Sequence, residues 1–247
     1  MAPAIAALAS KTTAHSDDSA PDVTSGLFWA SPERLGEANA FISDVYRFHH
    51  NASISNPYQR LLTLRAPHGA LVATTGLRRA DEGPLMVEHY LEAPVEMVLA
   101  TRGLCDLAPP RHQVMEVGAL ASASPGAGRR LMLSLVVVLE RLGIDWLVVT
   151  ASRDVRNGLA RLGIEMHTIG RAHRHCLDNP VDWGRYYERD PRVVVIRPLE
   201  VANSMRATPL GALLLAGAAQ LAPEAADPVP ALPHVHACSA AGDMPHG

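Results

Sequence analysis

Apolar residues recur with two different spacings along the chain. Short apolar or alternating runs, typical of β-strands, occur at residues 26–30, 59–65, 70–77, 113–121, 145–150, 165–169 and 193–196. Spacings of three and four, typical of helices, occur at residues 35–50, from 94 onward, and at 129–142 and 153–162. Early strands followed by alternating strands and helices predict an α/β fold, with a mixed central sheet flanked by helices on both faces.

The two ends of the chain lack this patterning. Residues 1–22 are rich in Ala, Ser, Thr and Asp and predict a disordered N-terminal arm. Residues 23–203 form the predicted domain. Residues 204–247 are rich in Ala and Pro and predict a disordered tail, in which the apolar run 210–221 indicates at most a weak helix.

Composition narrows the functional classes. The 247 residues are 48% hydrophobic and 19% charged with a net charge of -3, which suits a globular core and gives no basic surface for nucleic acid. No apolar run approaches the roughly 18 residues of a membrane span. Three widely spaced cysteines predict reduced thiols and a cytoplasmic location. The single lysine, Lys11, excludes a Walker-type phosphate loop and a core Schiff base.

A glycine turn lies between the strand at 113–121 and the helix at 129–142. Its residues Gly126, Ala127 and Gly128 would direct backbone N–H groups outward at a helix N-terminus, where they favour an anionic ligand such as a diphosphate. A dinucleotide fingerprint fails because its third glycine would fall at Leu131. The turn is more similar to the acyl-CoA loop of the GNAT N-acyltransferase superfamily, although Ala123 replaces the Gln or Arg that begins that pattern.

Several spaced motifs resemble one branch of this superfamily, the thermostable hemolysin family. They are residues 87–96 (VEHYLEAPVE), 115–121 (MEVGALA), 156–163 (RNGLARLG) and 183–187 (WGRYY). The family pattern prefers Asn where this chain has Ala119. The resemblance implies a GNAT-like fold related to autoinducer and N-acyl amino acid synthases. It therefore implies acyl transfer from a pantetheine thioester to an amine.

Two glutamates are the candidate catalytic groups. Glu116 lies in an apolar strand, where burial would raise its pKa toward that of a general base, and the resemblance associates an acidic residue there with amine activation. The alternatives are an exposed strand position or a pair with Arg111. Glu88 lies in an irregular segment that is typical of substrate-binding groups, with a solvated loop charge as the alternative.

The candidate donor-binding residues are Gly126, Ala127, Gly128, Arg129 and Asn157. Either Arg129 or Arg130 could contact phosphate, and Asn157 could hydrogen-bond the pantetheine arm or lie on the surface. Many GNAT enzymes carry a tyrosine on the helix at 153–162, but this chain has none there. Tyr186 or Tyr187 could protonate the departing thiolate, or it could leave unassisted.

Two histidine and cysteine clusters do not suggest a metal site. His173, His175 and Cys176 form one cluster and His234, His236 and Cys238 the other. Neither has the paired ligand spacing of a structural zinc site, and no oxyanion-hole turn accompanies Cys176 as a nucleophile.

The function predicted from the sequence is N-acyl transfer from acyl-CoA or an acyl carrier protein to a small-molecule amine. The acyl-phosphopantetheine donor would be a co-substrate, with no tightly bound cofactor. The alternatives are a hemolysin-like membrane-active protein and a GNAT-fold binding module without catalysis.

Overall fold

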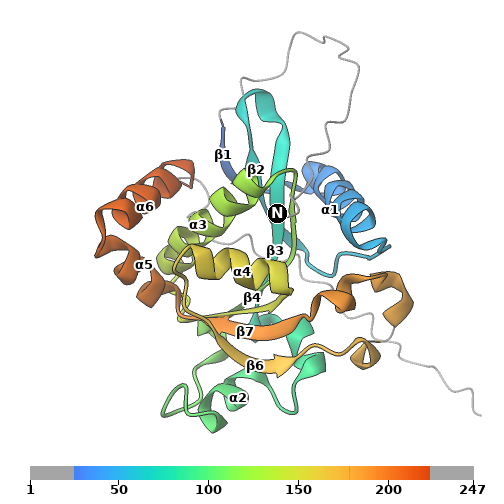
Figure 1. The fold of residues 1–247 in the computed structure, drawn as a ribbon, viewed down its shortest axis with the longest axis vertical. Helices are drawn as coiled ribbons and strands as arrows, with labels where there is room; N and C mark the ends of the chain where they lie inside the picture. The colour runs from blue at the N-terminus through green and yellow to red at the C-terminus, as the bar shows by residue number, and fades with distance from the viewer. Residues whose placement is uncertain (1–24, 178, 223–247) are drawn as a thin grey trace, which may run out of the picture.

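A single mixed sheet forms the centre of the molecule (Figure 1). The computed structural model describes residues 25–177 and 179–222. The strands are β1 Gly26–Trp29, β2 Arg60–Arg65, β3 Leu71–Arg79, β4 Val114–Ser122, β5 Trp146–Ala151, β6 His167–Arg171 and β7 Arg192–Ile196. Their order is β1-β2-β3-β4-β5-β7-β6, and only β4 and β5 run parallel. The predicted fold class is therefore confirmed.

Helices cover both faces of the sheet. They are α1 Leu35–His50, α2 Val95–Thr101, α3 Pro125–Arg141, α4 Arg153–Arg161, α5 Pro198–Arg206 and α6 Pro209–Leu221. Apolar residues of α1 and α2 pack on one face, and those of α3 pack on the other with α4, α5 and α6 beside them. Figure 1 shows α1 on the opposite side of the strands from α5 and α6.

Helix α3 begins earlier than its apolar pattern predicts. The sequence indicates a start at Arg129, but the helix begins at Pro125, with Ser124 as its N-cap. A proline at the first helical position has no N–H to leave unpaired, and a serine cap accepts a hydrogen bond from the first turn. The glycine turn Gly126–Gly128 is therefore the first turn of the helix itself.

The prediction that the chain is disordered from residue 204 onward was wrong for residues 204–222. This segment completes α5 and forms α6, and Met205, Leu215 and Ala218 are buried against α3. The apolar run therefore folds because α3 offers an apolar surface to it. The predicted N-terminal arm, residues 1–22, and the remaining tail, residues 223–247, lie outside the described residues. Among the helices of residues 25–177 and 179–222, none is both long and apolar enough to cross a membrane.

Strands β4 and β5 separate toward their carboxyl ends. Their parallel pairing runs from Val114–Trp146 to Val117–Val149, while β4 continues to Ser122 and β5 to Ala151. The register between β3 and β4 also shifts in this region, where Ala119 has a φ of +49°. An irregularity of this kind bends a strand and breaks its pairing. The separation opens a cleft at the middle of the sheet.

Candidate active site

A cavity occupies the cleft between β4 and β5. Residues 116–120 of β4 and residues 149–150 of β5 form its walls. The end of α1 contributes Tyr46 and His50, and Tyr186 closes the cavity from the segment before β7. Ligands of α/β folds commonly bind at the carboxyl ends of strands near a change of strand direction. This cavity is accordingly the candidate active site.

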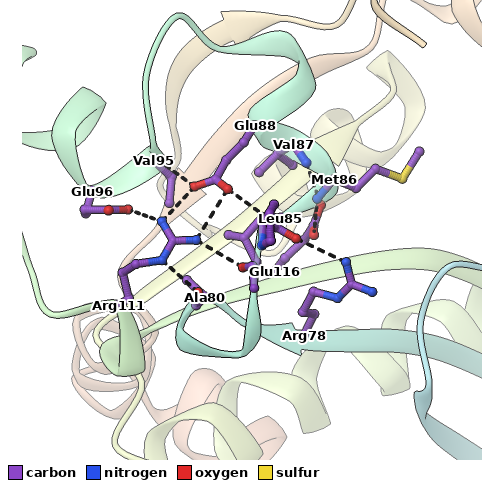
Figure 2. A network of polar contacts seen from close by, with 12 residues as sticks. Arg78, Ala80, Leu85, Met86, Val87, Glu88, Val95, Glu96, Arg111 and Glu116 are labelled. Carbon is purple, nitrogen blue, oxygen red and sulfur yellow. Dashed lines mark hydrogen bonds and ion pairs between the residues drawn. The ribbon is translucent and has the colours of Figure 1, made fainter. Parts of the chain in front are cut away.

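Glu116 is the buried acid of this cavity. Its side chain is 2% exposed, and its two carboxylate oxygens accept hydrogen bonds from the backbone N–H groups of Met86 and Val87, each at 2.9 Å (Figure 2). Neither alternative for Glu116 occurs, because it is not exposed and Arg111 pairs with other carboxylates. The carboxylate is thus held in one orientation at the cavity wall.

Burial raises the pKa of Glu116 from its ordinary value of 4.5 to about 7. The hydrogen bonds from Met86, Val87 and the Tyr58 hydroxyl act in the opposite direction, as does the charge of Arg78, but they do not cancel the cost of desolvation. A carboxyl group with this pKa is present in both protonation states near neutral pH. It can therefore accept and release a proton at that pH.

Tyr58 lies across two glycines of neighbouring strands. A side-chain carbon added at Gly76 would come within 2.3 Å of the Tyr58 ring, and one at Gly118 within 2.1 Å of its hydroxyl. Both glycines therefore leave room for the ring that carries a hydroxyl to Glu116. Tyr58 was not among the residues predicted from the sequence, and glycines inside two strands were the available signal.

Glu88 belongs to a different group of residues. Its carboxylate pairs with Arg111, which also binds Glu96 at 2.6 Å, and it accepts the backbone N–H groups of Leu85 and Val95 (Figure 2). Burial raises its pKa, but the hydrogen bonds from Arg111, Leu85 and Val95 outweigh that effect and hold the pKa below its ordinary value. Glu88 does not line the cavity. This geometry indicates that it fastens the segment 85–95 to Arg111, in the short turn that precedes β4.

The predicted phosphate turn lies at the N-terminus of α3. The Ser124 hydroxyl accepts the Ala127 N–H at 3.2 Å, and the Ser124 carbonyl accepts the Gly128 N–H at 3.1 Å. A side-chain carbon at Gly128 would lie 3.0 Å from the Ser122 hydroxyl, whereas at Gly126 the nearest atom is 3.9 Å away. Close packing on β4 therefore accounts for Gly128. Nothing within the fold demands a glycine at position 126.

The remaining predicted residues divide between the surface and the cavity. Arg129, Arg130 and Asn157 are exposed, and none of them lines the cavity. Tyr186 does line it and donates its hydroxyl to the Thr150 carbonyl at 3.1 Å. The Tyr187 hydroxyl instead shares a hydrogen bond of 2.6 Å with Tyr90. Of the two tyrosines, Tyr186 is therefore the one at the candidate site.

His50 is a second cavity residue that the sequence analysis did not single out. Its Nδ1 atom is buried and has no hydrogen-bond partner among the described residues. Burial lowers the pKa of His50 to about 4, so the imidazole is neutral at physiological pH. No sequence signal marked it, since it follows His49 at the end of α1 and only the fold distinguishes the two.

A second cavity adjoins the first on the side of α3 and α4. Every residue lining it is apolar, among them Leu120, Met132, Leu135, Val155, Leu159 and Ile196. It shares Val117, Leu120, Val149 and Val155 with the first cavity, so the two are neighbours across the cleft. An apolar space beside a buried carboxylate suits a ligand with a reactive head and a hydrocarbon chain.

The two histidines near residue 174 lie against each other. The rings of His173 and His175 stack with centroids 5.3 Å apart. Within residues 25–177 and 179–222, no three His, Cys, Asp or Glu side chains are grouped to hold a metal ion. The cluster His234, His236 and Cys238 lies outside the described residues.

Comparisons with known proteins agree with this architecture. The family model described as thermostable hemolysin matches residues 30–202. No protein with a curated description matches the sequence significantly. Among solved structures, FeeM, an N-acyl amino acid synthase from uncultured soil microbes, has a TM-score of 0.50 at 14% identity over 73% of this chain and 94% of its own.

Two further solved structures are less similar in shape. The AHL synthase LasI has a TM-score of 0.49 at 13% identity over 70% of this chain and 91% of its own. A GNAT family acetyltransferase from Staphylococcus aureus has a TM-score of 0.42 at 12% identity, covering 70% of this chain and 98% of its own. At such low identity, the similarity to FeeM shows a shared fold.

Proposed function

The chain belongs to the thermostable hemolysin family, and we propose that it acts as an N-acyltransferase. It would transfer an acyl group from an acyl-CoA or acyl-carrier-protein thioester to an amine of a small molecule. The observation that carries this proposal is the buried Glu116 carboxylate, with a pKa of about 7, at the cleft between β4 and β5. The GNAT-like fold shared with an N-acyl amino acid synthase supports the same chemistry.

The thioester donor would lie in the cleft with its acyl chain in the adjoining apolar cavity. Its phosphate groups would meet the N-terminus of α3, where the helix dipole and the Gly126 N–H favour a negative charge. Gly126 to Gly128 supply the backbone of this turn, and Arg129 lies on its exposed side. Asn157 is exposed outside the cavity, and its contact with the pantetheine arm stays a prediction.

The reaction would be a direct displacement at the thioester carbonyl. The neutral amine attacks the carbonyl carbon, Glu116 accepts a proton from the nitrogen, and a C–N bond replaces the C–S bond. Backbone N–H groups of residues 118–120, where pairing with β5 has ended, would stabilise the negative charge on the carbonyl oxygen.

The departing thiolate would recover a proton before the product leaves. Burial raises the pKa of Tyr186 well above 10, so its hydroxyl is protonated at neutral pH and would give up its proton only as it regains one, in the end the proton that Glu116 takes from the amine. The hydroxyl lies at the cavity wall near Thr150, at the end of β5 where the cleft widens. Tyr186 is therefore the proposed proton donor, in place of a tyrosine on α4.

The direct test is to incubate the purified protein with acyl donors and a panel of amines and to measure amide formation by mass spectrometry. Glu116→Gln should lower kcat/KM by about 10²-fold or more, because the amide cannot accept the proton. For the wild type, kcat/KM should rise with pH around an apparent pKa of about 7. The variant should lack the inflection near pH 7 and keep only the rise that comes from deprotonation of the amine.

Glu88→Gln is the matched control, since it alters a nearby glutamate that does not line the cavity. It should retain the pH-dependent rise in kcat/KM even if the variant is less stable. The proposal fails if no donor and amine pair yields an amide, or if Glu116→Gln is as active as the wild type.

A further inference from the structure

A polar cavity lies beside the candidate active site, on the side away from α3. Its lining includes the polar residues Ser55, Arg78, His89 and Asp182. Four of its residues, Ile54, Pro57, Met86 and Trp183, also line the cavity of Glu116. The two cavities therefore meet at these side chains, and a small molecule bound in the polar cavity could reach Glu116.

Arg78 lies opposite Glu116 on the neighbouring strand, on the same face of the sheet. The two residues are Cα partners in the antiparallel pairing of β3 with β4. Paired residues project from the same face of a sheet with their Cβ atoms about 5 Å apart. The Arg78 charge accordingly acts on the Glu116 carboxyl group, whose pKa it lowers. Figure 2 shows the two side chains reaching the same region from neighbouring strands.

The guanidinium of Arg78 is held in place without a carboxylate. It donates to the Pro57 carbonyl at 3.0 Å and to the Pro84 carbonyl at 3.1 Å. Among the described residues it forms no salt bridge, unlike Arg111, which binds two glutamates. Two hydrogen bonds to neutral groups leave donors and the positive charge of the guanidinium available to a ligand.

We propose that Arg78 binds the carboxylate of the acyl acceptor, which is therefore an amino acid or a closely similar amino-carboxylate. This inference rests on the proposed acyl transfer. The register places a cation and a base side by side on one sheet face, and an α-amino acid carries its two complementary groups on one carbon. With its carboxylate at Arg78, its amine faces Glu116, and its side chain extends into the polar cavity toward His89 and Asp182.

A kinetic comparison tests the proposal. Wild-type protein is assayed with free L-amino acids, their methyl esters and O-phosphoethanolamine as acceptors. The free acid should have a kcat/KM at least about tenfold higher than its ester, because the ester lacks the charge-assisted hydrogen bonds to Arg78. Arg78→Met should reduce this ratio to about threefold or less. Equal use of acid and ester, or a preference for the phosphate, would overturn the assignment.

The ratio of kcat/KM for the free acid to that for the ester does not depend on how much of the protein is folded. Arg78 also bonds two carbonyls of neighbouring loops, so Arg78→Met could lower the amount of active protein. Such a loss reduces both rates equally and leaves their ratio unchanged. Arg79→Met is the matched control, since the adjacent Arg79 pairs with Asp81 and does not line the cavity. The ratio in that variant should equal the wild-type ratio.

A binding measurement separates this inference from the proposed catalysis. N-dodecanoylglycine and its methyl ester are titrated into wild-type and Arg78→Met protein by calorimetry, without any thioester. Wild-type protein should bind the acid at least about tenfold more tightly than the ester, and Arg78→Met should bind both alike. Selective binding without turnover would refute the catalytic proposal alone. Equal binding of acid and ester by the wild type would refute the role of Arg78.

Discussion

At the scale of single residues, the candidate site depends on a carboxylate, that of Glu116, which is buried although ionised groups are more stable in water. Glu116 is 2% exposed, and its carboxylate has backbone N–H partners but no salt bridge among the described residues. A stable fold without a functional demand would favour an apolar residue at such a position. The cost of burying Glu116 is therefore a measurable property of the protein, independent of any substrate.

That cost predicts how stability depends on pH. The folded pKa of Glu116 is about 7, above its ordinary value of 4.5, so the folded state keeps a proton that the unfolded chain releases. The free energy of unfolding should fall as pH rises between these values, by about 2–3 kcal/mol. Urea titrations of wild type and Glu116→Gln from pH 5 to 8 measure this difference. A difference that does not vary with pH would contradict the raised pKa.

The two glycines of the α3 N-terminus should respond differently to alanine. Gly126→Ala should stabilise the protein by up to about 1 kcal/mol, because its side chain would make only an ordinary contact with the Ser124 hydroxyl and alanine favours a helix. Gly128→Ala should be less stable than Gly126→Ala, since its side chain would crowd the Ser122 hydroxyl. Thermal unfolding measures both effects.

The affinity for the acyl donor provides a second measurement on Gly126→Ala. Gly126→Ala should weaken the binding of acyl-CoA, since its methyl group would stand where the backbone meets the phosphates. Unchanged affinity in this variant would argue against a phosphate site at the turn.

Ala119 illustrates how one residue reflects the geometry of a strand. Its φ of +49° is a left-handed conformation that asparagine and glycine adopt more readily than alanine. The Asn that the family resemblance led us to expect at this position would have a backbone reason.

At the scale of elements, α5 and α6 extend the domain beyond the predicted boundary at residue 203. Gly211 shows how closely they meet, since a side-chain carbon there would lie 2.2 Å from the Met205 carbonyl. A tail without structure would tolerate any residue at this position. The close contact instead fixes the corner between the two helices.

Two leucines of α6 provide a test of this packing. Leu215→Ala should lower the free energy of unfolding by about 2–5 kcal/mol, because Leu215 is buried against α3 and its loss leaves a cavity. Leu213→Ala is the control, since Leu213 is 70% exposed and its loss should change stability by no more than about 0.5 kcal/mol. Chemical denaturation compares the two variants. Equal effects would mean that α6 does not contribute to the core.

Two carboxylates, those of Glu116 and Glu88, hold the short helix η4, Met86–Tyr90, in place. Glu116 accepts two backbone N–H groups of this turn, and Glu88 and Arg111 tie the same segment to α2. The turn therefore serves both as the wall of the cavity and as the anchor of the acid. The sequence alone does not distinguish the candidate base, Glu116, from the structural glutamate, Glu88, because both lie near apolar residues.

At the scale of the whole molecule, three cavities adjoin one another around the cleft between β4 and β5. The cleft leads to an apolar space between the sheet, α3 and α4, and to a polar space beside β3. The proposed acyl transfer would use this arrangement, with the donor chain and the acceptor head on opposite sides of Glu116. No single element contains it.

The apolar cavity predicts a preference for longer acyl donors. Each methylene buried there should contribute about 0.8 kcal/mol, so kcat/KM should rise about fourfold per methylene until the cavity is filled. Val136→Phe, which narrows the cavity from α3, should move the optimum to shorter chains. A series of straight-chain acyl-CoA donors measures this optimum in both proteins. An optimum that does not move would place the acyl chain elsewhere.

Local patterning along the chain was sufficient to predict the sheet and a helix after the glycine turn, and together with the family resemblance it indicated Glu116 as the candidate base. These features depend on apolar periodicity and on residue types within a few positions of one another, so they are readable from the sequence. The fold class and the family were confirmed, while the roles of Glu116, Glu88, Asn157 and the glycine turn stay predictions.

Only the tertiary structure decided which distant residues share the site. Tyr58, Arg78 and Tyr186 reach Glu116 or its cavity through strand register and loop packing, and neither of these leaves a local trace in the sequence. Contacts between distant segments also explain Glu88, which pairs with Arg111 and does not line the cavity. They explain α6 as well, whose apolar run folds against α3. Contacts between segments far apart in the chain settle burial, and burial settles the charge state on which the proposed chemistry depends.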